Sequence, residues 1–201
     1  MAYYHDIITE KSWRELKNLS KNIKFILIGG WAIYLYSKTI KSKDIDIIVD
    51  YPQISRLRKI YDVSKNERLK KYEARRGEVQ IDVYLPHYSF LGIPVEDLMQ
   101  HSSSLEGFTV LKKEWLFILK LYVLSQRVRS VKGEKDFLDL LSLFQSGLNE
   151  TPILKIIKKY SLEKTLDLFI GLLNERTHVP ELNLNPHTYK KIKTEILKSL
   201  K

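Results

Sequence analysis

The stretch Lys24 to Asp50, KFILIGGWAIYLYSKTIKSKDIDIIVD, contains the residues that decide the fold. Its apolar run Phe25 to Ile28 is rich in branched residues and stops at Gly29-Gly30, as a buried strand stops where the backbone must turn sharply. Helix-forming residues follow from Trp31 to Tyr36, and a second strand is expected over Ile45 to Val49. The stretch therefore predicts a strand, a glycine turn, a short helix and a strand in direct succession.

Two carboxylates, Asp44 and Asp46, stand where the second strand begins. Side chains two residues apart in a strand point to the same face, so these acids are expected to lie together and to repel each other. One interpretation is the solvated face of an edge strand, with the glycine pair as a simple turn. Ile48 continues on the acidic face, however, which indicates that both faces are buried beyond Asp46. Half-buried paired carboxylates need a cation, and Mg²⁺ binds through carboxylates, water and substrate phosphates. The pattern therefore favours a metal–phosphate site.

The glycine pair with Trp31, the helix and the segment Ser42-Lys43-Asp44-Ile45-Asp46-Ile47 together resemble the signature of the DNA polymerase β-like nucleotidyltransferase superfamily. That superfamily carries a third carboxylate on a later strand. Asp82, in the expected strand Val79 to Leu85, VQIDVYL, is placed to match it. The resemblance implies an α+β protein, with a nucleotidyltransferase-fold mixed β-sheet domain that also contains helices.

The resemblance also implies the chemistry of the site. Asp44, Asp46 and Asp82 would be catalytic and would hold Mg²⁺ or Mn²⁺, with Asp82 assisting deprotonation of the attacking hydroxyl. The nucleoside triphosphate, such as ATP, would be bound by four residues, Gly29, Gly30, Ser42 and Lys43. The glycines would let backbone N–H groups approach the phosphates at a helix N-terminus, where the helix dipole favours anions.

Composition limits the partners. Among 201 residues, 34 Lys and Arg stand against 24 Asp and Glu, so the formal net charge of +10 favours a polyanion. A heat-loving or AT-rich source would also explain a chain rich in isoleucine, lysine and tyrosine. The chain has no cysteine, which excludes disulfides and thiolate metal sites. No signal core or transmembrane run is visible, so we expect a cytoplasmic protein without a membrane partner.

Much of the positive charge falls between Tyr51 and Arg76, where nine basic residues face three acidic ones. Tyr51-Pro52 predicts a turn and Gln53 to Tyr61 a helix. The region from Lys65 to Arg76 is strongly basic and alternating. It is interpreted either as a surface for RNA, such as tRNA, or for a triphosphate, or as a solvated helix and edge strand decorated with lysine.

From Lys112 onward the pattern predicts helix after helix. The expected organisation is a catalytic domain over residues 1–111 and a C-terminal helical bundle over residues 112–201. Lys120 and Arg127 are seven residues apart and are expected to project together from the first helix. Three further helices are expected in the tail, over Pro152 to Lys159, Leu162 to Asn174 and His187 to Leu200.

The start of this helical region, from Leu119 to Leu140, sharpens the resemblance. Leu119-Lys120-Leu121, Arg127 and Lys135-Asp136-Phe137-Leu138-Asp139-Leu140 resemble a pattern in AbiEii-type nucleotidyltransferases, the toxin components of abortive-infection and toxin–antitoxin systems. The resemblance implies that Lys120, and with it Arg127, contacts nucleotide phosphates. The alternative for Lys120 is an ordinary surface lysine on an amphipathic helix. Gly29-Gly30-Trp31-Ala32 also occurs in aminoglycoside- and lincosamide-type nucleotidyltransferases, which are the second possible relatives.

Three functions remain open at this stage. The first is transfer of a nucleoside monophosphate from a triphosphate to a hydroxyl of an RNA end, a protein or a small molecule. The second is a catalytically silent protein of the same fold that binds RNA. The third is a toxin–antitoxin partner protein that binds an antitoxin or a second copy of itself. The absence of G-x-x-x-x-G-K-[ST] excludes a P-loop enzyme, and the spacing of the five histidines does not suit a zinc protease.

Overall fold

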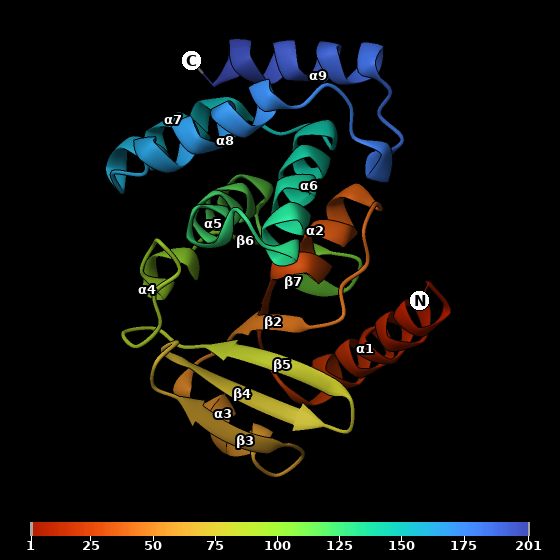
Figure 1. Ribbon diagram of the computed structural model, residues 1–201. Coiled ribbons are helices and arrows are strands. Elements are labelled where there is room, and N and C mark those ends of the chain that lie inside the picture. Colours follow the sequence, from red (N-terminus) through yellow and green to blue (C-terminus); the bar gives the residue numbers. More distant parts are fainter. Residues whose placement is uncertain (1, 201) are drawn as a thin grey trace. The chain divides into compact units, whose positions relative to one another are not determined.

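The computed structural model describes the backbone of residues 2–200 and the side chains of residues 7–200. Contacts within the chain divide it into two units, Met1–Lys112 and Lys113–Lys201 (Figure 1). The predicted domain boundary, after residue 111, lies one residue before this division. That the units are separate functional domains stays a prediction.

The first unit is built on one mixed sheet of seven strands, in the order β3-β4-β5-β2-β1-β7-β6. The neighbours β2 and β5 are parallel, as are β1 and β7, and the other pairs are antiparallel. The elements are α1 Ala2–Asn22, β1 Ile26–Ile28, α2 Gly29–Ser37, β2 Ile45–Ile48, α3 Tyr51–Leu57, β3 Asp62–Asn66, β4 Lys71–Arg76, β5 Val79–Tyr84, α4 Val95–Leu98, β6 Ser102–Leu105 and β7 Phe108–Leu111.

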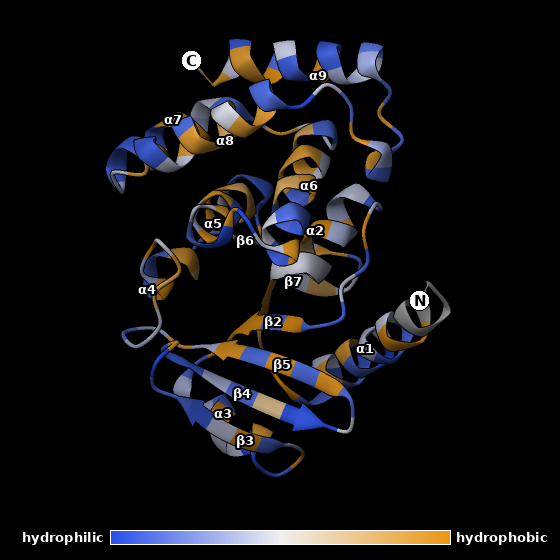
Figure 2. Cartoon of the chain, in the orientation of Figure 1, coloured by the Kyte–Doolittle hydropathy of each residue, from blue (hydrophilic) through white to orange (hydrophobic). Residues whose placement is uncertain are grey.

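Burial explains which strands are central. Leu27 of β1, Ile45 and Ile47 of β2 and Ile81 of β5 are fully buried. Ile48 and Val49 are also buried, which confirms that both faces are covered beyond Asp46. The hairpin β3-β4 at one end of the sheet is largely hydrophilic, in contrast to β2 (Figure 2). Charged side chains suit such an edge because they discourage pairing with another chain.

The structure differs from the predicted helices and strands at three places in the first unit. The second helix begins at Gly29 itself, two residues before the predicted start, so the glycine pair belongs to its first turn. Tyr51-Pro52 is the first turn of α3 instead of a turn before it, because proline has no N–H to lose at a helix start. The sequence did not predict the strand β6 at Ser102 to Leu105, because serine has little strand preference. This segment is a strand because it pairs with β7 across the turn at Glu106-Gly107.

Among the described residues of the second unit, the regular elements are helices, as expected, and one isolated β-bridge joins Val179 and Leu184. Its elements are α5 Lys113–Arg127, α6 Val131–Gln145, α7 Glu150–Lys159, α8 Glu163–Glu175, the 3-10 helix η1 Pro180–Leu182 and α9 Pro186–Ser199. At its centre Phe169 of α8 packs its ring against Phe117 of α5 and Phe137 of α6, with both ring centroids 5.8 Å away. Within the described range, no helix has both the length and the apolar character needed to cross a membrane.

Candidate active site

A row of side chains crosses the sheet of the first unit at the end of β1. Ile28 pairs with Asp46 of β2, Asp46 with Asp82 of β5, and Asp82 with Glu73 of β4. Directly opposed residues on neighbouring strands point to the same face. Two of the predicted carboxylates, Asp46 and Asp82, are therefore neighbours on adjacent parallel strands, and Glu73 adds a third acid to the row.

Gly29 lies directly against Asp46. A Cβ on Gly29 would lie 2.1 Å from Asp46 Oδ2 and 2.6 Å from its Cγ, which is far inside van der Waals contact. Gly29 also has φ +66°, a left-handed conformation that costs other residues energy. Position 29 therefore requires glycine for two reasons: the backbone has a positive φ, and the Asp46 carboxylate occupies the space of a Cβ.

The N-terminus of α2 faces this region with its own donors. Its N-cap residue, Ile28, is extended and makes no side-chain capping hydrogen bond to the first turn. The first amides of the helix, at Gly29, Gly30 and Trp31, have no intrahelical acceptors, because the first turn of a helix never does. Such amides, together with the helix dipole, suit an anion.

The loop into β2 carries the remaining predicted residues of the first unit. Ser42 is buried at 4% exposure, Lys43 is exposed and Asp44 is half-buried. Asp44 precedes the first strand residue by one position. The loop thus leaves Lys43 accessible to a charged ligand next to the carboxylate row.

A lysine that was not among the predicted site residues compensates the negative charge of the carboxylate row. Lys71 of β4 is 7% exposed, and its Nζ lies 2.5 Å from Asp82 Oδ2 and 3.5 Å from Glu73 Oε1. Gln80 Nε2 donates to Asp82 Oδ1 at 2.9 Å. The Asp82 carboxylate is therefore held by a cation and an amide from its own sheet.

Glu73 is held in its charged form. Asn66 Nδ2 donates to Glu73 Oε1 at 2.9 Å, and this hydrogen bond, with the charges of Lys71 and Arg75, keeps the pKa of Glu73 below its ordinary value. Glu73 was also missed by the sequence analysis. The signal existed: a tight turn at Gly77-Glu78 fixes the β4-β5 register, and that register sets Glu73 opposite Asp82.

The donor set suits a hard divalent cation, since carboxylate oxygens are the protein ligands that Mg²⁺ and Mn²⁺ prefer. In the described part of the chain, no three Asp, Glu or His side chains are arranged so that they could hold a metal ion as they stand. The ammonium of Lys71 already lies on Asp82. A metal ion at Asp46 and Asp82 would therefore have to share that carboxylate with Lys71.

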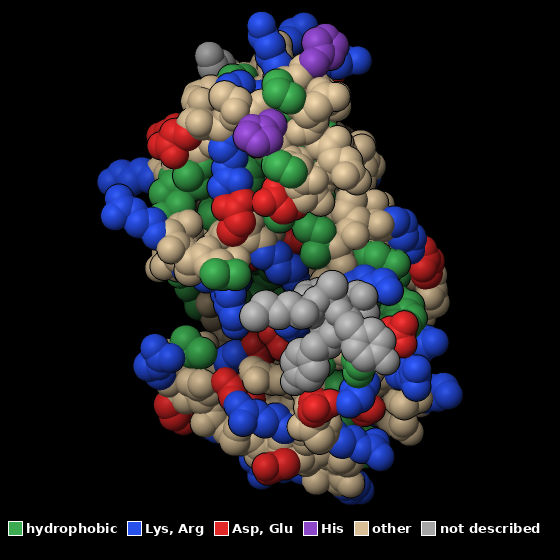
Figure 3. All heavy atoms as spheres, turned by 45° about the vertical axis from the view of Figure 1, so that its right-hand side comes forward, with side chains coloured by type: hydrophobic (Ala, Val, Ile, Leu, Met, Phe, Trp, Pro, Cys, Tyr) green, Lys and Arg blue, Asp and Glu red, His purple; other side chains and the backbone are tan. Residues whose placement is uncertain are grey.

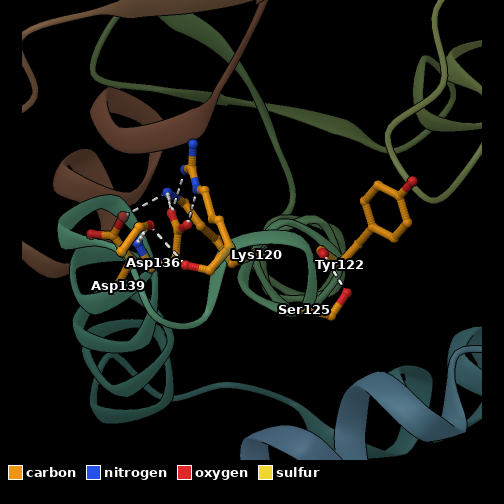
Figure 4. A network of polar contacts seen from close by, with 8 residues as sticks. Lys120, Tyr122, Ser125, Asp136 and Asp139 are labelled. Carbon is orange, nitrogen blue, oxygen red and sulfur yellow. Dashed lines mark hydrogen bonds and ion pairs between the residues drawn. The ribbon is translucent and has the colours of Figure 1, made fainter. Parts of the chain in front are cut away.

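The predicted basic residues of the second unit form a network with acids of the same unit (Figure 4). Lys120 of α5 lies 2.8 Å from Asp136 Oδ1 and 2.7 Å from Asp139 Oδ2, both on α6. Arg127 Nε lies 2.7 Å from Asp136 Oδ2. Lys120 and Arg127 do project together, as expected, and they meet on one carboxylate.

The acids of this network are buried, so water screens their interactions with Lys120 and Arg127 only weakly. Asp136 and Asp139 are 1% and 0% exposed. Burial alone would raise the pKa of Asp136, but the charges of Lys120 and Arg127 outweigh it and hold the pKa below the ordinary value. Burial likewise opposes the charge on Lys120, yet Asp139 and Asp136 raise its pKa. A phosphate on Lys120 or Arg127 would therefore compete with these acids.

The basic region Tyr51 to Arg76 forms α3 and the hairpin β3-β4. Several of its cations are matched by acids: Lys65 and Lys70 contact Glu67, and Arg75 contacts Glu73. Over the face drawn in Figure 3, Lys and Arg side chains are spread widely, with Asp and Glu side chains among them. The positive charge in this view is distributed and does not form one patch.

No protein-family model matches the sequence, and no curated protein sequence matches it. Solved structures do match the fold. A nucleotidyltransferase-like antigenic protein from Paracoccidioides brasiliensis is similar over 97% of this chain and 92% of its own, with a TM-score of 0.55 and 19% identity. JHP933 from Helicobacter pylori is similar over 95% and 90%, with a TM-score of 0.52 and 16% identity. The antibiotic-resistance factor ANT(2'')-Ia is similar over 82% and 97%, with a TM-score of 0.50 and 14% identity.

These likenesses show that the chain has the nucleotidyltransferase fold. The predicted fold class, a mixed sheet with helices in an α+β protein, is therefore confirmed. At such identities a structural likeness shows the fold alone.

Replacement of Gly29 should damage the site specifically. We expect Gly29→Ala to destabilise the protein by about 1–3 kcal/mol, because φ is positive and the new methyl group must displace Asp46. It should also abolish metal-dependent nucleotide binding. Urea unfolding and calorimetric titration of a nucleoside triphosphate with Mg²⁺ measure the two effects.

Gly77→Ala is the matched control, since Gly77 has φ +59° but nothing within 4 Å of a Cβ. It should cost about 1–2 kcal/mol of stability and leave nucleotide binding unchanged. Equal binding by both variants would show that the contact with Asp46 is irrelevant to the site.

Removal of the Lys71 charge should strengthen metal binding. In Lys71→Met the carboxylates of Asp82 and Glu73 lose a cation, so the Mn²⁺ dissociation constant should fall on the order of tenfold. Titration followed by the electron paramagnetic resonance of free Mn²⁺ measures it. Lys65→Met, which removes an exposed lysine of the neighbouring strand, should change little. Weaker Mn²⁺ binding in Lys71→Met would contradict the competition between lysine and metal.

The Asp136 network should show in the pH dependence of stability. The pKa of Asp136 is lowered on folding, so its contribution is present at neutral pH and is lost as the pH falls below about 4. Asp136→Asn should cost about 3–5 kcal/mol at pH 7, because Lys120 loses a buried partner. The difference from the wild type should shrink as unfolding is measured from pH 4 to pH 2. Asp167→Asn, at an exposed acid of α8, should show neither effect. A difference that does not depend on pH would contradict this role.

Proposed function

We propose that this protein is a metal-dependent nucleotidyltransferase, which transfers a nucleoside monophosphate from a nucleoside triphosphate to a hydroxyl acceptor. One observation carries the proposal. Asp46 and Asp82 oppose each other on paired strands of a nucleotidyltransferase fold, beside a glycine whose missing Cβ makes room for Asp46. A merely structural turn would not need this space.

The residues of the chain have distinct roles in this proposal. Asp44, Asp46 and Asp82 hold the Mg²⁺ or Mn²⁺ ions. When bound, the metal acidifies the acceptor hydroxyl and neutralises phosphate charge. The first amides of α2, at Gly29 and Gly30, bind phosphate oxygens, and a short distance along the chain Ser42 and Lys43 add a hydroxyl and a positive charge.

The reaction is an in-line displacement. The acceptor oxygen forms a bond to the α-phosphorus, and the bond from that phosphorus to the bridging oxygen breaks. The hydroxyl proton passes to Asp82 and pyrophosphate leaves. Asp82 is suited to this role because Lys71 and Gln80 fix the orientation of its carboxylate.

The finer assignment follows the resemblance to AbiEii-type proteins. Lys120, Arg127 and Asp136 of the resembling segment form one network, which supports the resemblance, and a phosphate bound by Lys120 or Arg127 would displace Asp136 from that network. We assign ATP or another triphosphate as donor in the cytoplasm, and an RNA end, a protein or a small molecule as acceptor. Phosphate binding by Lys120 and Arg127, tRNA binding by Tyr51 to Arg76, and pairing with an antitoxin or a second copy belong to the same hypothesis.

Transfer from labelled triphosphates tests the function. The protein is incubated with each of the four α-³²P nucleoside triphosphates and Mg²⁺ or Mn²⁺, with total RNA and with lysate proteins as acceptors. We expect label from one triphosphate to enter an acceptor, with pyrophosphate released. Asp46→Asn and Asp82→Asn should lower the rate by at least about 100-fold, because the ligands of the metal are lost.

Asp50→Asn is the control, because Asp50 is an exposed acid just past the other end of β2. It should transfer label at the wild-type rate. Binding of RNA that persists without transfer, and that is equal in the Asp46 and Asp82 variants, would instead support a catalytically silent RNA-binding protein.

A further inference from the structure

A cavity of about 380 Å³ opens in the first unit, away from the carboxylates of the row described above. Its lining comes from α1, α2, the loop after α2 and the β6-β7 turn. The residues that matter for its chemistry are three aromatic residues and three lysines, Trp13, Trp31, Tyr34, Lys17, Lys38 and Lys41. The volume is in the range of small-molecule sites.

The aromatic wall is held in place by its own contacts. Trp31 is 1% exposed and donates from Nε1 to Ser12 Oγ at 2.8 Å, which ties α2 to α1. Trp13 lies on Trp31 with ring centroids 4.9 Å apart. Tyr34 meets the Trp31 ring edge-on at 5.5 Å. Trp13 and Tyr34 are only partly buried, so the wall presents fixed aromatic surface to the cavity.

The lining carries a surplus of positive charge. Four basic residues stand against two acids, and both acids are already used: Glu10 pairs with Arg14, and Glu106 pairs with Lys38. Among the described residues no ion pair involves Lys17 or Lys41. The Lys17 ammonium lies 5.9 Å from the centre of the Trp13 ring, so one cation stands beside the exposed aromatic surface.

We propose that this cavity binds one nucleotide unit, a planar base with its phosphate, at a site separate from the carboxylate row. The base stacks on Trp13, as bases stack on aromatic side chains in single-strand binding proteins, and the Tyr34 ring, inclined at 72° to that of Trp13, meets its edge. The phosphate is neutralised by Lys17 and Lys41. Either a free mononucleotide or the end of a single strand supplies this chemistry.

The cavity is close in the chain to the proposed catalytic residues. Trp31 follows Gly29 by two residues, and Lys41 precedes Asp44 by three. Binding in the cavity does not depend on catalysis. That the bound nucleotide belongs to the acceptor of the transfer reaction rests on the proposed function.

Tryptophan fluorescence reads this site directly. The chain has three tryptophans, and Trp13 and Trp31 line the cavity while Trp115 belongs to the second unit. The full-length Trp115→Phe variant therefore reports on the cavity alone. Titrations are made in EDTA, which removes metal-dependent triphosphate binding, with AMP, adenosine, ribose 5-phosphate and short single-stranded oligoadenylate. Saturable quenching by AMP or oligoadenylate is expected, with adenosine and ribose 5-phosphate binding at least tenfold more weakly.

Variants made in the Trp115→Phe background identify the groups. Lys17→Glu and Lys41→Glu should each weaken binding about five- to tenfold and lower the salt dependence of oligoadenylate binding by about one ion. Lys59→Glu, at an exposed lysine outside the cavity, should leave binding unchanged. Trp13→Ala should weaken binding about 5- to 150-fold. The lysine variants keep the test decisive if Trp13→Ala does not fold.

The outcomes distinguish a free mononucleotide from a strand end, and they test the cavity site independently of the proposed catalytic site. Tighter binding of oligoadenylate than of AMP identifies a strand end, and the reverse identifies a free mononucleotide. Asp46→Asn should keep the quenching while losing transfer, so failure of the catalytic proposal leaves this one testable. An absence of quenching by every probe, or quenching that Lys17→Glu and Lys41→Glu leave intact, overturns the assignment.

Discussion

The close approach of Gly29 to Asp46 is the constraint on which the first unit depends. The carboxylate of Asp46 occupies the space of a Cβ at position 29, so the end of β1, the start of α2 and the second residue of β2 must keep one arrangement. That arrangement sets the helix N-terminus beside the carboxylate row. Amides that suit an anion and acids that suit a cation thus lie close together, as the proposed phosphoryl transfer requires.

In both units a lysine compensates the charge of a poorly exposed aspartate. Lys71 lies against Asp82 in the sheet, and Lys120 lies against Asp136 between α5 and α6. Acids that are this poorly hydrated would be costly without a cation. In the sheet, Lys71 also holds the Asp82 carboxylate in one orientation.

The helices α1 and α2 connect the aromatic cavity to the proposed catalytic residues. The hydrogen bond from Trp31 to Ser12 and the tilted ring contact between Trp13 and Trp31 join the helix that begins at the glycine pair to the N-terminal helix. The N-terminus of α2 therefore lies at the carboxylate row, while aromatic side chains of the same helix line the cavity. Both proposed nucleotide sites thus depend on the position of this one short helix.

Local pattern in the sequence determined the elements and the identity of most candidate residues. The apolar run before Gly29, the Asp-Ile-Asp step and the strand around Asp82 follow from side-chain period and glycine freedom, which are local properties. The nucleotidyltransferase fold was predicted from the family resemblance that these residues carry. Only the tertiary structure decided which charges compensate one another. Lys71 lies eleven residues from Asp82, and Lys120 lies sixteen from Asp136. Such partners depend on strand register and helix packing, which local pattern does not specify.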